Sequence, residues 1–457
     1  MKKKKITLIQ MIRNAIKYFK KNRKHKRRKL RKWVKYFILL VIILIIVLLM
    51  FSSNIKIKNI SVNDNKIHIV LSKDKDIYCI LTDDSSIPTL NSDSWIKANN
   101  NECIFDYDNS KHNLYIKNDE EIIYKNKKSI VYNFKFNSET EYYPINNKYK
   151  LDYSYDYIGN KPRIKWRSSD TNIISVKDGN INTISEGNAI VTAEYNGSVS
   201  KIKITSTSLI VDKPKTFDLK KKFLPCEKYS VEENDLLDEI LYNRAHKVGF
   251  KTRASAVEVA RFLTLEFPYR INYFNENGRI TQSNKIDGEG RYYHVGLYLN
   301  SSRYDNITKS SRKPKIWGCS LYSDPMHKAM DNGLDCSGFV SWVLLNAGYD
   351  VGDIGAGFAD DADLTDFGKL TANSKKLIES NQIKVGDLLH SYKAGGHIAI
   401  IVGIDEDYYY VAQALWYDER GVIITKETKE TLLSEFPHVV LMDSYYENDG
   451  NLTNMWY

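Results

Sequence analysis

The stretch GLDCSGFVSWVLLNAG, residues Gly333–Gly348, carries the strongest local pattern in the chain. Asp335 stands where a helix N-cap would stand, which predicts that Cys336 lies in the first turn of a helix. At that position the helix dipole and the free backbone N–H groups favour the thiolate, which is the nucleophilic form of cysteine. The apolar side chains that follow at helical spacing predict a largely buried helix: Phe339, Val340, Val343, Leu344 and Ala347.

A nucleophilic cysteine needs a base, and folding brings that base close from elsewhere in the sequence. The candidate stretch is VGDLLHSYKAGGHIAIIVGI, residues Val385–Ile404, in which a two-glycine turn leads into a strand that begins with His397. The next apolar run, YYYVAQAL (Tyr408–Leu415), is predicted to pair with that strand as a hairpin. Gln413 on the second strand is placed to orient the imidazole, as the third member of a Cys–His–polar set.

The succession of DCSGFV, VGDL, GHIAIIVG and a strand with a polar residue before Ala resembles the NlpC family of papain-like cysteine peptidases. The resemblance covers residues 332–457 and implies an α+β, papain-like domain. It implies Cys336 as the nucleophile, His397 as the base and acid, and Gln413 as the orienting residue. No CxxC or HExxH metal motif appears in the sequence, and no cofactor or metal ion is expected. In this family the third residue is more often His. The implied substrates are peptidoglycan stem peptides, often cleaved between D-glutamate and the diamino acid.

Other interpretations of these residues stay open. His294, in YYHVGLYL, also begins a strand-like run, although it precedes Cys336 against the order of the family. An amidase or a transpeptidase could use the same scaffold. The C-terminal domain could also be inactive, in a surface adhesion or scaffold protein.

Upstream of this domain the sequence indicates β-structure. Residues 138–207 contain WRSSDTNIISVKDGNINTISEGNAIVTAEYNG, which resembles bacterial Ig-like domains of group 2. That resemblance implies a β-sandwich that acts as a spacer or an adhesion module. Residues 56–134 hold short apolar runs separated by Asn, Asp and Ser, which predicts another small sandwich. Cys79 and Cys103 are a possible disulfide pair within it.

Two helices are predicted before the candidate nucleophile. Ser230 and Glu233 fit a capping box that opens the first, and Thr252 opens a second that ends before Pro268. The stretch from residue 269 to residue 331 shows no clear pattern. Cys226 and Cys319 are assigned no role.

The net charge of +11 is unevenly distributed. Residues 1–36 hold 17 Lys or Arg and no acidic residue, while the remaining 50 basic and 56 acidic residues give the rest of the chain a net charge of −6. Residues 36–55 contain no charge, and at 1.5 Å per residue a helix of that length spans a bilayer. Basic residues stay on the cytoplasmic side, so the tail is expected inside and the acidic body outside.

This charge distribution does not indicate a nucleic-acid partner, since a basic tail beside a membrane span is a topology signal. A cleaved signal peptide would have a shorter basic region and an A-x-A-like site, and neither is present.

The sequence thus predicts a single-pass, membrane-anchored peptidase of stem peptides, with an α+β catalytic domain after two Ig-like β-sandwiches and a transmembrane helix. Its oligomeric state is left open. The predicted parts are a basic cytoplasmic tail (1–35), a transmembrane helix (36–55), a first Ig-like domain (56–134), a group 2 Ig-like domain (138–207), a linker (208–228), a helical and loop extension (229–331) and the peptidase core (332–457).

Overall fold

The computed structural model describes residues 13, 17, 36–42, 55–73, 75–125, 129–215, 221–273, 296, 333–349, 351, 367–392, 396–416 and 421–457. The chain divides into two compact units. The first comprises residues 1–133 and 155–162, and the second comprises residues 134–154 and 163–457. The boundary crosses strands β8 (Ile130–Phe136) and β11 (Tyr153–Ile158), so each of them begins in one unit and ends in the other.

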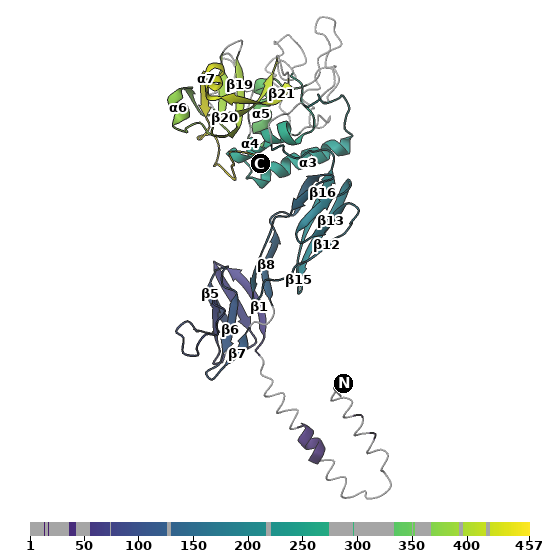
Figure 1. The fold of residues 1–457 in the computed structure, drawn as a ribbon, viewed down its shortest axis with the longest axis vertical. Coiled ribbons are helices and arrows are strands. Elements are labelled where there is room, and N and C mark those ends of the chain that lie inside the picture. The colour runs from purple at the N-terminus through teal and green to yellow at the C-terminus, as the bar shows by residue number, and fades with distance from the viewer. Residues whose placement is uncertain are drawn as a thin grey trace. The chain divides into compact units, whose positions relative to one another are not determined.

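The first unit is a β-sandwich (Figure 1). One sheet has the order β1-β2-β5, with β1 at Ile57–Asn63, β2 at Lys66–Leu71 and β5 at Glu102–Asp106. The other has the order β4-β3-β6-β7, with β4 at Ile96–Lys97, β3 at Tyr78–Thr82, β6 at Asn113–Lys117 and β7 at Ile122–Lys125. Alternate residues of β2 are buried between the sheets, as the strand period of two requires.

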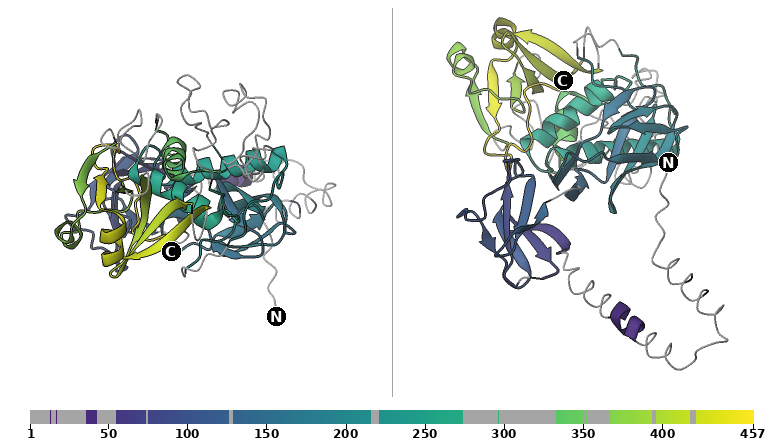
Figure 2. Two further views of the ribbon diagram at one scale, coloured as in Figure 1. Left: turned by 90° about the horizontal axis from the view of Figure 1, so that it is seen from above. Right: turned by 60° about the horizontal axis from the view of Figure 1, so that its bottom comes forward.

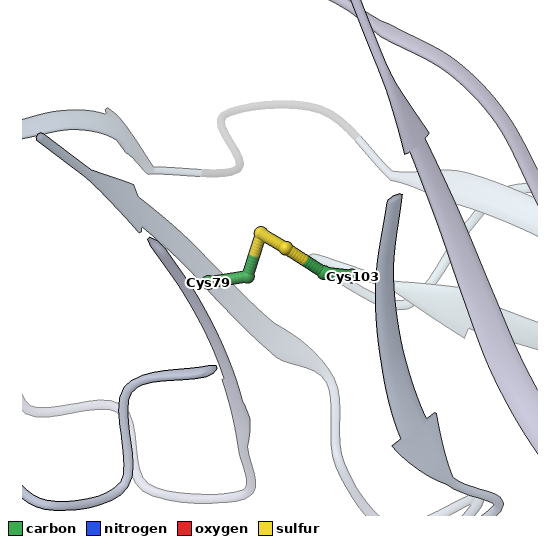
Figure 3. Close-up of a disulfide and its surroundings, with 2 residues drawn as sticks. All are labelled: Cys79 and Cys103. Atoms are coloured by element: carbon green, nitrogen blue, oxygen red, sulfur yellow. A yellow bond between two sulfur atoms is a disulfide. The ribbon is translucent and has the colours of Figure 1, made fainter. Parts of the chain in front are cut away.

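The structure joins Cys79 and Cys103 in a disulfide (Figure 3). Cys79 lies on β3 and Cys103 on β5, so the bond links the two sheets through the core, where both residues are fully buried. Ile158, from the segment that returns to this unit, is fully buried in the same core. Asp156 of that segment accepts hydrogen bonds from Tyr107 and Asn133.

The second unit begins with another β-sandwich. Its larger sheet has the order β12-β15-β16-β9, with β12 at Lys165–Ser168, β15 at Gly187–Tyr195, β16 at Ser198–Thr207 and β9 at Thr140–Pro144. Its smaller sheet has the order β10-β14-β13, with β10 at Lys148–Lys150, β14 at Asn180–Thr183 and β13 at Ile174–Lys177. The turn before β14 needs Gly179, whose φ is +76° and whose added Cβ would meet the Tyr153 ring at 2.7 Å.

This second sandwich is attached to helix α3 (Val231–Lys247) by charged and polar contacts. Arg244 on the helix donates to the backbone oxygen of Tyr142 at 2.9 Å. Lys247 forms an ion pair with the buried carboxylate of Glu141 at 2.6 Å. The Tyr142 hydroxyl donates to Glu239. The second sandwich therefore contacts α3, the first helix of the extension.

Both predicted helices of the extension are present. Ser230 and Glu233 form the capping box of α3, and Thr252 caps α4 (Arg253–Arg261). Helix α4 continues as a π-helix, η1 (Phe262–Glu266), and ends before Pro268, as the sequence predicts.

The C-terminal part is a six-stranded antiparallel sheet with helices on both faces (Figures 1 and 2). The strand order is β17-β22-β18-β19-β20-β21. In that order the strands are β17 (Lys369–Ala372), β22 (His438–Leu441), β18 (Leu388–Ser391), β19 (His397–Ile404), β20 (Tyr408–Leu415) and β21 (Gly421–Thr428). Helix α5 (Cys336–Asn346) packs on one face, and α6 (Lys375–Glu379) and α7 (Lys429–Glu435) pack on the other. Ile398 and Ile400 face the first layer and Ala399 and Ile401 face the second, which explains why β19 is continuously apolar.

Arg253, at the start of α4, connects the extension to this sheet. Its side chain is fully buried, and its guanidinium forms ion pairs with Asp387 at 2.8 Å, Asp443 at 2.5 Å and Asp449 at 3.1 Å. It also donates to the backbone oxygen of Val385. Because Gly386 approaches Arg253 closely and has a φ of +93°, the turn into β18 accepts only glycine without strain.

The predicted membrane span at residues 36–55 lies largely outside the described residues. Residues 36–42 are helical. In the part of the chain that is described, no helix is both long enough and apolar enough to cross a bilayer.

Replacing Arg253 with Leu should lower the free energy of unfolding by about 3–5 kcal/mol, because it leaves the buried Asp387 carboxylate without its ionic partner. Urea titration monitored by circular dichroism measures this loss. The matched control is Lys375→Ala, which breaks an exposed Lys375–Glu379 pair and should change stability by less than about 0.5 kcal/mol. Equal effects of the two substitutions would contradict the structural role given to Arg253.

Candidate active site

Helix α5 presents Cys336 in its first turn, as the sequence predicts. Asp335 is the N-cap, and its carboxylate accepts a 2.7 Å hydrogen bond from the backbone N–H of Gly338. Cys336 is buried, at 7% exposure, and carries a thiol and no disulfide. The helix is surrounded by core, since Phe339, Trp342 and their neighbours are buried. The thiol is therefore held at the positive end of a fixed helix.

The predicted hairpin is present, and it positions the candidate base. His397 is the first residue of β19, which pairs antiparallel with β20. Gln413 on β20 has its Oε1 atom 2.7 Å from His397 Nε2. An amide oxygen only accepts hydrogen bonds, so Nε2 carries the proton and donates it. The Nδ1 atom of the ring is then the basic nitrogen.

Cys336, His397 and Gln413 line one pocket with a volume of about 590 Å³. Its walls are partly aromatic: Trp416 is 58% exposed and makes an edge contact with Tyr273, and the ring of Phe436 lies 5.9 Å from that of His397. Two carboxylate side chains, those of Glu427 and Glu435, also line the pocket. The remaining lining residues are Ser391, Gly396, Ala414, Leu415 and Thr425.

Burial lowers the pKa of His397, because a charged imidazolium loses its hydration in the pocket. Two weaker influences raise that pKa: the hydrogen bond with Gln413 and the negative charge of Asp335. The Asp335 carboxylate thus caps the helix of the nucleophile and favours the protonated form of the base. The sequence predicts Asp335 only as a helix N-cap. Its electrostatic effect on His397 depends on the folded structure.

Some residues noted in the sequence have other positions or roles. Asp387, the aspartate of the VGDL stretch, belongs to the buried Arg253 cluster and accepts from the backbone of Lys384 and Met442, so it is structural. His294 and Cys319 lie outside the described residues. Cys226, to which the sequence assigned no role, is disulfide-bonded. Within the described ranges, no group of three or more His, Cys, Asp or Glu side chains could hold a metal ion.

Thr425, which no sequence motif singles out, also contacts the site: its Oγ1 accepts a 2.7 Å hydrogen bond from Gln413 Nε2. It lies on β21, which pairs antiparallel with β20 and places Gln413 opposite Ile423 and Val411 opposite Thr425. Alternation along this hairpin puts Gln413 and Thr425 on one face. The alternation within each strand is visible in the sequence, but the register that brings the two residues together is not.

Comparisons with known proteins give little. No family model matches the chain, and no curated protein matches it. A crystal structure of domains 4 and 5 of the S-layer protein SbsC is similar over 21% of this chain and 63% of its own, with 16% identity and a TM-score of 0.16. The structure of SbsC domains 1–6 is similar over 40% of this chain and 29% of its own, with 13% identity and a TM-score of 0.15. The structure of the tandem Ig repeats of Dlar is similar over 33% of this chain and 91% of its own, with 10% identity and a TM-score of 0.12. TM-scores this low carry no argument about this chain.

In a Cys336→Ala variant, the imidazole of His397 should titrate below the ordinary histidine value of about 6.5, because burial favours the neutral ring. At a pH between the lower pKa of the folded protein and the higher pKa of the unfolded chain, the unfolded chain binds more protons than the folded protein. The free energy of unfolding therefore rises with pH across this range and falls on acidification. NMR of ¹⁵N-labelled histidine measures the pKa, and His397→Gln assigns the signal. Titration at or above the urea-unfolded value would contradict the burial argument.

Proposed function

We propose that this protein is a membrane-anchored cysteine peptidase that cleaves peptidoglycan stem peptides, with the bond between D-glutamate and the diamino acid as its target. The observation that carries the proposal is that Cys336, at a helix N-terminus, and His397, hydrogen-bonded to Gln413, line the same pocket. The resemblance of DCSGFV, VGDL and GHIAIIVG to the NlpC family supports the choice of substrate and a papain-like fold for the domain.

The proposed chemistry is that of a thiol–imidazole pair. His397 Nδ1 takes the proton of the Cys336 thiol, and the thiolate attacks the carbonyl carbon of the scissile amide. Backbone N–H groups in the first turn of α5 are suited to stabilise the oxyanion of the tetrahedral intermediate. The imidazolium then gives its proton to the leaving amine, and an acyl-enzyme forms. Water, deprotonated by His397, releases the acid product and restores the thiol.

The proposed location is the outer face of a cell membrane. The basic tail at residues 1–35 followed by an uncharged stretch supports a cytoplasmic N-terminus. The Cys79–Cys103 disulfide supports an oxidising environment for the body, because such bonds are rare in the cytosol.

Muropeptides incubated with the full chain should gain free amino termini at the diamino acid, and Cys336→Ala should abolish this product because the nucleophile is removed. Mass spectrometry of the fragments reads the new termini. Cleavage of the bond between the amino sugar and the stem peptide would instead indicate an amidase. Formation of new peptide cross-links would indicate a transpeptidase. Unchanged muropeptides with wild-type protein would show that the proposal is wrong.

Two histidine variants form a matched pair for the same assay. His397→Ala should reduce turnover by at least about 10²-fold, the contribution of a general acid–base catalyst. His294→Ala should retain activity, because the proposal gives that residue no chemical role. The opposite result would reassign the base.

Topology is tested by protease added to intact cells. The body after residue 55 should be digested, and the tail at residues 1–35 should be protected by the membrane. Mass spectrometry of peptides from both regions measures protection, with permeabilised cells as the control. Protection of the body in intact cells would contradict the proposed orientation.

A further inference from the structure

The side chain of Gln413 forms two hydrogen bonds among the described residues, one from each end of its amide. Oε1 accepts from His397 Nε2 at 2.7 Å, and Nε2 donates to Thr425 Oγ1 at 2.7 Å. Gln413 is 4% exposed, so water does not readily replace either partner. A buried amide N–H without a partner is costly. The N–H on His397 Nε2 requires the oxygen end of the amide, and Thr425 then supplies the acceptor that the nitrogen end needs.

The orientation of this amide matters for the proposed reaction. His397 becomes an imidazolium when it takes the thiol proton, and both of its nitrogens are then donors. Only the oxygen end of Gln413 can accept from that ring. If the amide were rotated by 180°, its NH₂ group would face a second donor, which would disfavour the charged state. An acceptor for the nitrogen end stabilises the amide in the orientation that the charged ring requires, and thereby favours protonation of His397.

We propose that Thr425 is a positioning residue for the catalytic pair: its hydroxyl accepts from the Gln413 amide N–H and so anchors the amide while its oxygen faces His397. The antiparallel register of β20 and β21 places Thr425 diagonally from Gln413 on the same face. Thr425 also lines the pocket that contains Cys336 and His397. This inference rests on the proposed cysteine-peptidase function and adds a fourth residue to its machinery.

The test compares Thr425→Val, which removes only the hydroxyl, with Thr425→Ser, which keeps it, in the full chain in detergent. With Thr425→Val, kcat should fall about tenfold and KM should change less than about twofold, as expected for one hydrogen bond that acts on the base. Thr425→Ser should stay within about threefold of wild type. Thr371→Val is the control, because Thr371 lies on β17 at the opposite edge of the sheet.

A measurement without substrate separates this inference from the proposed function. The rate of Cys336 alkylation by iodoacetamide follows the thiolate–imidazolium population as pH varies. Thr425→Val should slow it at neutral pH about tenfold, whereas Thr425→Ser and Thr371→Val should keep the wild-type profile. Such a result supports the role of Thr425 even if muropeptides prove not to be substrates. A wild-type alkylation profile for Thr425→Val, or equal loss with Thr425→Ser, would overturn it.

Discussion

The buried guanidinium of Arg253 is the interaction on which the C-terminal architecture depends. It lies on α4, yet its carboxylate partners come from the start of β18 and from the chain after β22. A charge this deeply buried is tolerated only when its donors are paired, and here three carboxylates and the Val385 carbonyl accept from it. Tyr446 adds its ring, 4.9 Å from the guanidinium carbon. The upstream helices are therefore an integral part of the fold that holds the site.

The effect of this cluster reaches the pocket through β18. Asp387 accepts from Arg253 and from the Met442 backbone, which fixes the point where β18 begins. The far end of the same strand, Ser391, pairs with His397 on β19. The base thus stands on a strand whose partner is held at its other end by buried ion pairs. A rigid support of this kind is what a proton-transferring residue requires, because small displacements are costly in rate.

Helix starts, the hairpin of β19 and β20 and the candidate site residues were predictable from the sequence, whereas the buried ion pairs and the strand register were not. The N-cap at Asp335, the two helix starts and the strand that begins at His397 each depend on a few neighbouring residues, and the structure confirms them. Arg253 and Asp387 are 134 positions apart, and neither has a local pattern that announces the pair. Thr425 was missed for a related reason, since its role appears only once the register of β20 and β21 is known.

The path of the chain through the first sandwich bears on how the protein is synthesised. Its core contains Ile158, so this sandwich cannot be completed on the ribosome until residues 155–162 have emerged. By then β9 and β10 have also been made, whereas β15 and β16, which complete the larger sheet of the second sandwich, have not. The nascent chain therefore holds unpaired strands of the second sandwich at the time when the first sandwich becomes complete. Segments of the two sandwiches alternate along the sequence, because residues 134–154 of the second unit lie between the two segments of the first. A single recombination point within residues 134–162 would therefore separate parts of a sandwich that fold together.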